Sequence, residues 1–172
     1  MYRKSLSYLA SLTLIASGMA VAADGHLPGR VLRVIDGDRL VVDVSGAHYQ
    51  VSLRGIDAPE LNQPWGDTAA AQLRRTLGGA FVVIALEQPD RRRPLIGSVQ
   101  HKGRDVAADL LYDGLAWSTI AAPSTPYEAE HRYRLLQHEA REARRGLWSD
   151  SQPIAPWDWR RQSWPASSTP PD

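Results

Sequence analysis

Short apolar runs separated by turn motifs constrain the fold of this chain more than any other feature. Three of them follow one another early in the sequence: "RVLRVI" (30–35), "RLVVDV" (39–44) and "HYQVSLRGI" (48–56). The intervening "DGD" and "SGA" motifs are typical of tight turns. In the third run Tyr49, Val51 and Leu53 alternate with polar residues, which predicts a strand with one buried and one solvated face.

The remaining sequence mixes helix and strand patterns. Residues 66–79 predict a helix, with Ala69, Leu73 and Leu77 on one stripe and a Gly-Gly pair at its end. Further patterns predict two strands, at residues 80–87 and 95–101, and a short helix at 104–114. A brief extended segment is predicted at 115–120 and a last helix at 127–145. A sheet of so few strands can protect its edges only by closing into a barrel. We therefore expect a mainly β fold with α-helices, a five-stranded OB-type Greek-key barrel with about three helices.

The first 22 residues have the features of an export signal. Arg3 and Lys4 form a positive segment, an apolar run follows, and "AVA" (20–22) is a small-residue cleavage motif. The apolar run is shorter than the ~20 residues of a spanning helix, so we expect no membrane span once residues 1–22 are removed. A retained membrane anchor is the alternative. The predicted location is the periplasm or the medium, and the absence of cysteine fits export without distinguishing between them.

After the signal, residues 23–165 are predicted to form one domain, and we expect a monomer. The Pro- and Trp-rich segment that follows the last predicted helix is predicted to be an irregular strap, with Trp148, Trp157 and Trp159 packed back on the barrel. Base stacking by these tryptophans is the alternative. Residues 166–172 are predicted to be a disordered tail.

The charge balance does not by itself indicate a nucleic-acid-binding protein. The formal net charge of the chain is +1, and removal of Arg3 and Lys4 with the signal lowers it to −1. Basic residues nevertheless cluster, at residues 91–93 and along the last predicted helix. For the helix we expect a solvated face, with phosphate binding as the alternative.

Four carboxylates lie around the third predicted strand. Asp36 and Asp38 belong to "IDGDR", while Asp57 and Glu60 belong to "LRGIDAPE". They are candidates for the oxygen ligands of a metal-dependent enzyme, and the alternative is that they only form the turns of a small barrel. For Asp36 we favour the turn.

Six motifs carry a resemblance to a known family: "VIDGD", "LRGIDAPE", "QPWGDTAA", "LYDGLAW", "EARRGLW" and "PWDWR". In this order and spacing, from Val31 to Arg161, the sequence resembles the staphylococcal nuclease-like (thermonuclease) family. The resemblance implies an OB barrel and a calcium-dependent phosphodiesterase that acts on DNA and RNA.

The resemblance also implies roles for particular residues. Asp38 and Asp57 would be calcium ligands together with the backbone carbonyl of Ala58, and Glu60 would orient or deprotonate the attacking water. Calcium binds six to eight hard oxygen atoms, so this set leaves positions for water and a phosphate oxygen. The proline after Ala58 forces an extended backbone there, which turns Asp57 and Glu60 toward one spot.

Two family positions have changed in this chain. The resemblance implies two arginines that clamp the reacting phosphate, and Ser52 and Pro94 stand in their places. An arginine that stabilises a phosphoryl-transfer transition state contributes about 10³–10⁵ in rate. We therefore predict impaired hydrolysis.

Other arginines are candidates for the missing contact. Arg93, a predicted catalytic residue, and its neighbours Arg91 and Arg92 belong to a loop, where a displacement of one residue does little harm. Arg39 follows a predicted metal ligand and is a further candidate for phosphate binding, with a role at the strand edge as the alternative. Arg54 lies about 7 Å along the strand from position 52 and is a poor substitute.

Three functions remain open from the sequence. The first is an exported calcium-dependent nuclease with impaired activity, which binds DNA or RNA weakly. The second is a catalytically inactive pseudo-nuclease that acts as a nucleic-acid or protein binding module. The third is a scaffold role unrelated to nucleic acid.

Overall fold

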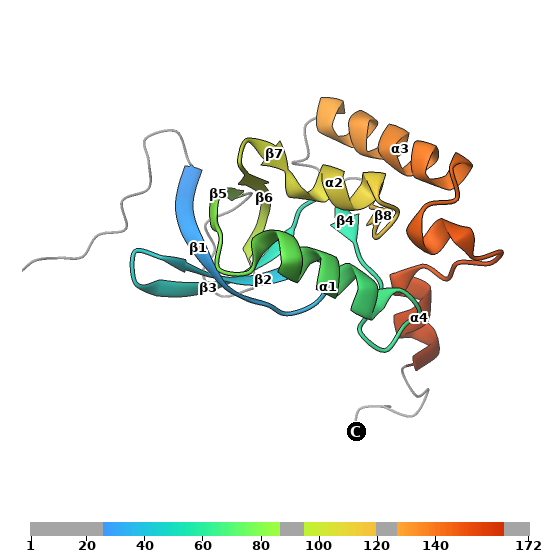
Figure 1. The fold of residues 1–172 in the computed structure, drawn as a ribbon, viewed down its shortest axis with the longest axis horizontal. Helices are drawn as coiled ribbons and strands as arrows, with labels where there is room; N and C mark the ends of the chain where they lie inside the picture. The colour runs from blue at the N-terminus through green and yellow to red at the C-terminus, as the bar shows by residue number, and fades with distance from the viewer. Residues whose placement is uncertain (1–25, 87–94, 120–126, 164–172) are drawn as a thin grey trace, which may run out of the picture.

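The computed structural model describes residues 26–86, 95–119 and 127–163 (Figure 1). The predicted signal (1–22), the arginine loop with Pro94 and the predicted tail (166–172) lie outside the described residues. The predictions for these segments, and for the ends of the domain, therefore stay predictions.

Five strands form the predicted barrel. Four antiparallel pairings run in the order β3-β2-β1-β5-β6, and a parallel pairing of β3 with β6 closes the ring. The strands are β1 (His26–Val34), β2 (Arg39–Val44), β3 (Ala47–Leu53), β5 (Phe81–Leu86) and β6 (Leu95–His101). A short strand, β7 (Arg104–Asp105), extends β6, and β4 (Ile56–Asp57) pairs with β8 (Trp117–Ser118) in a separate two-stranded sheet. The five-stranded OB-type barrel is thus confirmed.

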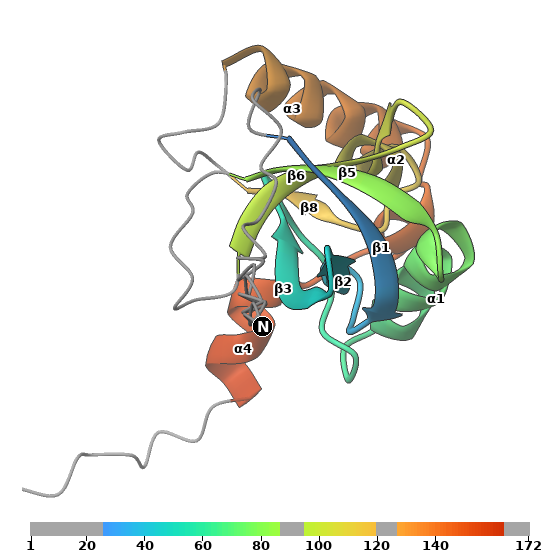
Figure 2. The same ribbon diagram turned by 90° about the vertical axis from the view of Figure 1, so that its left-hand side faces the viewer.

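Helices cover the barrel from outside (Figures 1 and 2). They are α1 (Gly66–Leu77), α2 (Val106–Tyr112), α3 (Tyr127–Glu142) and α4 (Pro156–Ser163), with a short 3₁₀ helix, η1 (Gly146–Ser149), between the last two. In both views α3 lies at the top of the molecule and α4 at the bottom. Among the described residues, no helix is long and apolar enough to cross a membrane.

The barrel interior follows the predicted alternation of apolar and polar residues. Val51 and Leu53 of β3 are buried, and Tyr49 packs against the same core. The apolar stripe of α1, Ala69, Leu73 and Leu77, is fully buried against the strands. The helix therefore ends where the glycine pair predicted.

The third predicted strand does not run unbroken to Ile56. It ends at Leu53, turns at Gly55, whose φ is +75°, and resumes as β4. Tyr133 of α3 packs on this turn, because a Cβ at position 55 would lie 2.8 Å from its Cε2 atom. Because of this turn, the segment that carries Asp57 does not continue in the direction of β3.

The Pro- and Trp-rich segment is more regular than predicted. The expectation of an irregular strap is wrong for residues 146–149 and 156–163, which form η1 and α4. Proline fits the first turn of a helix because its missing N–H has no partner there, and α4 begins at the buried Pro156. Packing is confirmed for Trp148, which is buried and contacts Trp117 at a ring distance of 4.4 Å, whereas Trp157 is 37% exposed.

Candidate active site

The four predicted carboxylates line one hollow of about 300 Å³ at the surface of the barrel. The residues that line it belong to the turn before β2, to β2 and β3, to the segment after β3, and to α4. The lining residues are Asp36, Asp38, Arg39, Ser52, Asp57, Ala58, Glu60 and Arg160. The sequence motifs "IDGDR" and "IDAPE" are therefore brought together in space.

Close backbone packing holds the two acidic motifs against each other. A Cβ at Gly37 would lie 2.6 Å from the Cβ of Ala58 and 2.8 Å from that of Ala69, so only glycine fits between them without displacement. The Ala58 N–H donates a hydrogen bond of 3.0 Å to Oδ2 of Asp38. The glycine of the "DGD" turn thus places Asp38 beside the "DAPE" segment.

Asp36 organises the turn, as its sequence context predicted. Its Oδ1 accepts hydrogen bonds from the backbone N–H groups of Asp38, at 3.2 Å, and Arg39, at 2.9 Å. The Arg39 guanidinium pairs with its other oxygen. Although Asp36 lines the hollow, its side chain is 6% exposed and these contacts engage both of its oxygens.

Gln63 fixes the backbone of Glu60. Its Oε1 accepts the Glu60 N–H at 3.1 Å, and its Nε2 donates to the Ile154 carbonyl at 2.7 Å. The side chain is buried, so both of its polar ends depend on these partners. Gln63 therefore links the acidic segment to the chain that leads into α4.

Arg160 of α4 binds two of the predicted site acids. Its Nη2 lies 2.7 Å from Asp57 Oδ2, and its Nη1 lies 3.2 Å from Asp57 Oδ1 and 2.7 Å from Glu60 Oε1. The hydrogen bonds that Arg160 donates to Asp57 and Glu60 raise its pKa, so the guanidinium stays charged. This residue was not among the sequence-predicted site residues.

The hollow carries more negative than positive charge. Four carboxylates face two guanidiniums, which gives a net charge of −2 when all six groups are ionised. Burial, with further contributions from Asp36 and Asp57, raises the pKa of Asp38 from 3.8 to about 7, and the hydrogen bond from Ala58 opposes this shift only in part. An added positive charge would relieve the cost of ionising Asp38.

The donor set fits a hard divalent cation in its chemistry and its charge. Carboxylate and carbonyl oxygens are the ligands that calcium prefers, and two positive charges would balance the hollow. The side chains are nevertheless not gathered as a metal cluster: no three or more His, Cys, Asp or Glu within the described ranges are so placed. Arg160 lies against Asp57 and Glu60 instead, where it provides the positive charge.

Arg39 and Ser52 are neighbours on the wall of the hollow. They are directly paired in the register of β2 and β3, so their side chains project from the same face. A terminal nitrogen of Arg39 lies 3.9 Å from Glu60 Oε2. Arg54 instead donates to the Ala85 carbonyl at 3.3 Å and is not part of the lining, as expected of a poor substitute.

The predicted arginines of the loop cannot be placed relative to this hollow. Arg91, Arg92, Arg93 and Pro94 all belong to residues 87–94, which lie outside the described residues. On α3, by contrast, Arg134 pairs with Glu130 at 2.6 Å, and Arg141 lies over the ring of Trp148 at 4.1 Å. The predicted solvated face of this helix thus includes arginines engaged within the fold.

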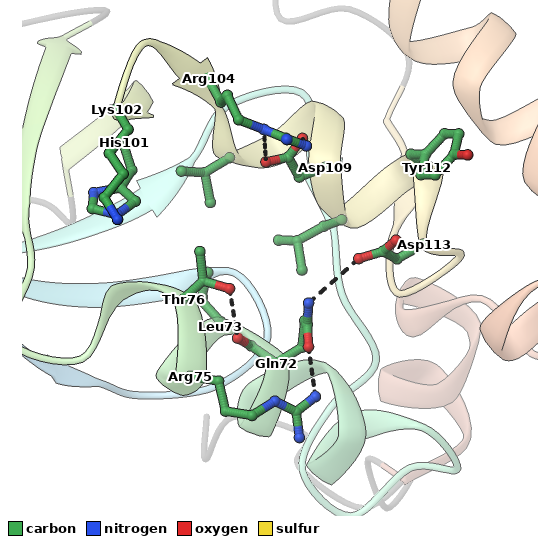
Figure 3. A pocket seen from close by; sticks show the side chains of 12 residues that line it. Gln72, Leu73, Arg75, Thr76, His101, Lys102, Arg104, Asp109, Tyr112 and Asp113 are labelled. Carbon is green, nitrogen blue, oxygen red and sulfur yellow. Dashed lines mark hydrogen bonds and ion pairs between the residues drawn. The ribbon is translucent and has the colours of Figure 1, made fainter.

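A second hollow, of about 490 Å³, lies between α1, α2 and the β6–β7 turn (Figure 3). It contains an ion pair and a hydrogen bond from Gln72 to a carboxylate. Arg104 contacts Asp109 at 2.7 Å, and Gln72 donates to Asp113 at 3.4 Å. None of the acids of the "DGD" and "DAPE" motifs lines it, so the smaller hollow is the candidate active site.

Comparison with known proteins identifies this OB-type barrel as a nuclease-like domain. A family model described as "Staphylococcal nuclease homologue" matches residues 50–150. The chain belongs to the staphylococcal nuclease family.

Full-length bacterial relatives and plant relatives support this assignment. An uncharacterized endonuclease of Escherichia coli O157:H7 is 34% identical over 90% of this chain and 97% of its own length. Protein ParB of Escherichia coli is also 34% identical, over 95% of this chain and 96% of its own. The staphylococcal-like nuclease CAN1 of Arabidopsis thaliana is 31% identical over 69% of this chain and 35% of its own length.

Sequence reasoning missed two residues of the site, Gln63 and Arg160. Both lie inside motifs that carried the family resemblance, "QPWGDTAA" and "PWDWR". Gln63 lies close to its partner Glu60 in the sequence, whereas Arg160 lies 100 residues away from Glu60. No local periodicity predicts a contact of the second kind, which depends on how α4 docks.

Proposed function

We propose that this protein is an exported, calcium-dependent phosphodiesterase of DNA or RNA. The observation that supports it is the convergence of Asp38, Asp57 and Glu60 on one hollow with Arg39 in its wall. Membership of the staphylococcal nuclease family supports a nuclease-like activity, and the family resemblance supports calcium as the ion. Substrate, ion and cellular location are parts of the proposal.

The site residues take the following roles. Asp38, Asp57 and the Ala58 carbonyl would hold calcium, which would supply charge stabilisation at the phosphate and acidify bound water. Glu60 orients the attacking water and accepts its proton on a carboxylate oxygen. Burial of Asp38 and the fixed backbone at Glu60, held by Gln63, support this division of roles.

Arg39 binds a non-bridging phosphate oxygen in this proposal. Its position opposite Ser52 supports the role, because side chains at directly paired positions start about 5 Å apart and project to the same side. An arginine at position 39 can therefore reach much of the space that an arginine at position 52 would reach. Arg93, with Arg91 and Arg92, remains the proposed second phosphate contact.

We expect slower hydrolysis than in relatives that keep both family arginines. Loss of one such residue costs about 10³–10⁵ in rate, and the effects of two are not additive. Substitution by Arg39 from a different strand recovers only part of this loss, because the guanidinium approaches the phosphate from another direction.

The alternative is a pseudo-nuclease that binds nucleic acid or protein without turnover. The contacts of Arg160 favour it, since they neutralise a proposed metal ligand and the proposed base. In that case binding would depend on salt and on Arg91, Arg92 and Arg93. Reversal of these three charges would then abolish binding.

Plasmid nicking by the purified protein separates the two functions. The proposed enzyme nicks supercoiled DNA with calcium, stops when excess chelator is added, and loses activity in Asp57→Asn. Asp67→Asn, an exposed acid on α1, serves as the matched control and should behave as the parent. Salt-sensitive binding without nicking at high protein concentration would instead identify the pseudo-nuclease.

Export is tested separately. We expect protein recovered from the periplasm or the medium to begin near Ala23 when its intact mass is measured. Recovery of the full mass from a membrane fraction would instead identify residues 1–22 as a retained anchor.

A further inference from the structure

Two arginines line the acidic hollow among the residues that the structure describes, Arg39 from β2 and Arg160 from α4. We propose that Arg160 is a catalytic residue that contacts the substrate phosphate, an inference that rests on the proposed function. In the substrate-free protein it is the counter-ion of Asp57 and Glu60. In the substrate complex its N–H donors turn to the phosphate.

The position of the guanidinium supports a phosphate contact. It lies within 2.7 Å of both Asp57 and Glu60, the proposed metal ligand and the proposed base. The phosphate and the attacking water must meet between these two residues if they act as proposed. Arg160 is therefore already beside the place where the proposed reaction occurs.

Helix α4 does not need Arg160 in order to dock. Trp159 donates to Asn62 at 3.2 Å, and Gln63 holds the Ile154 carbonyl at the start of the segment. Ala155 and Pro156, at the start of the helix, are buried. Because the side chain of Arg160 is 49% exposed, its ion pairs contribute little to stability, and a purely structural role explains its placement poorly.

Charge balance explains why Arg160 changes partner. The hollow has a net charge of −2 with all six groups ionised, which repels a phosphate. A divalent cation held by Asp38 and Asp57 would balance it, and Asp57 would then attract the guanidinium less strongly. The planar fork of Arg160 is then available for two parallel hydrogen bonds to phosphate oxygens, a geometry that lysine cannot provide.

The test uses the full chain with Arg160→Ala, Arg160→Lys and, as a matched control, Arg161→Ala. Arg161 follows on the same helix, pairs with Asp158 and is absent from the hollow. Calorimetric titration measures the affinity for calcium alone and the affinity for thymidine 5′-phosphate with calcium saturating. Thermal unfolding and kcat/KM on a short oligonucleotide are measured beside them.

We expect Arg160→Ala to weaken nucleotide binding by about tenfold or more and to lower kcat/KM by about 10²-fold. Its calcium affinity should equal or exceed that of the parent, because a competing cation has been removed. Weaker nucleotide binding with undiminished calcium binding cannot arise from general disruption of the site. Arg160→Lys should keep the unfolding midpoint but not the nucleotide affinity, and Arg161→Ala should match the parent throughout.

Nucleotide affinity within about twofold of the parent in either Arg160 variant would overturn the inference. It would also be overturned if both variants lost calcium affinity and nucleotide affinity and had a lower unfolding midpoint. If the parent cleaves with calcium and Arg160→Ala cleaves equally well, the inference fails while the proposed function stands. If the parent neither binds calcium nor cleaves, the proposed function fails first and takes this inference with it.

Discussion

Arg39 and Ser52 are directly paired across strands β2 and β3, and both line the acidic hollow. Side chains at such positions project from the same face of the sheet and occupy neighbouring space beside it. Under the proposed function, Arg39 on the adjacent strand takes the place of the family arginine expected at position 52.

An exchange of these two residues tests that relationship. Arg39→Ser should lower kcat/KM by about 10²-fold, because it removes the guanidinium from this wall of the hollow. The double variant Arg39→Ser with Ser52→Arg should recover activity to the level of the parent or above it. Arg33→Ser, at an exposed arginine of β1, is the control. A double variant as inactive as Arg39→Ser would show that the two positions are not equivalent.

The buried carboxyl of Asp38 should make stability depend on pH in metal-free protein. Because its pKa is raised from 3.8 to about 7 in the folded state, the protonated form stabilises the fold fully below pH 3.8, and this contribution is lost as pH rises through 7. In chelator, Asp38→Asn should therefore raise the free energy of unfolding at pH 8 by on the order of 2 kcal/mol. The gain should shrink toward zero near pH 4, as measured by urea unfolding at both pH values. A constant difference would contradict the assignment.

Gln63 should matter for stability and for the site together. Gln63→Ala leaves the Glu60 N–H and the Ile154 carbonyl without their partner, which should cost about 1–3 kcal/mol in urea unfolding. It should also lower activity, because the Glu60 backbone loses its fixed position. Gln100→Ala, at an exposed glutamine of β6, should cost little. Equal stability of the two variants would remove Gln63 from the account.

Tyr133 should stabilise the fold without affecting the chemistry. Its hydroxyl donates to Asp105 at 2.8 Å, and burial, followed by the charge of Asp105, raises its pKa, so it remains a neutral donor. Tyr133→Phe should lower the free energy of unfolding by about 1–2 kcal/mol and leave kcat unchanged. Tyr127→Phe, at a tyrosine of the same helix that is 75% exposed, is the control. A loss of kcat with stability intact would point to a role at the site.

The barrel could be predicted from the sequence because its signals are local. Alternation along β3 and the stripe of Ala69, Leu73 and Leu77 each reflect burial of one face, and both are present in the structure. The break at Gly55 was not predicted, because glycine in a strand pattern tolerates either an extended or a left-handed backbone. The packing of Tyr133 decides between them, and it comes from a distant helix.

The site was predictable where short motifs define it and not where distant segments meet. Asp38, Asp57 and Glu60 were expected to converge, and they line one hollow. Arg160 comes to the same hollow only because α4 docks there, through contacts of Trp159 and Ile154 that no sequence pattern indicates. A helix in a Pro- and Trp-rich segment was unexpected for a related reason, since tertiary packing overrides weak local propensity.

Calcium titration of the purified protein tests the central claim most directly. We expect saturable binding of one ion per chain by calorimetry, and loss of that binding in Asp57→Asn. Absence of any calcium binding by the parent, or binding of equal affinity in Asp57→Asn, would contradict it.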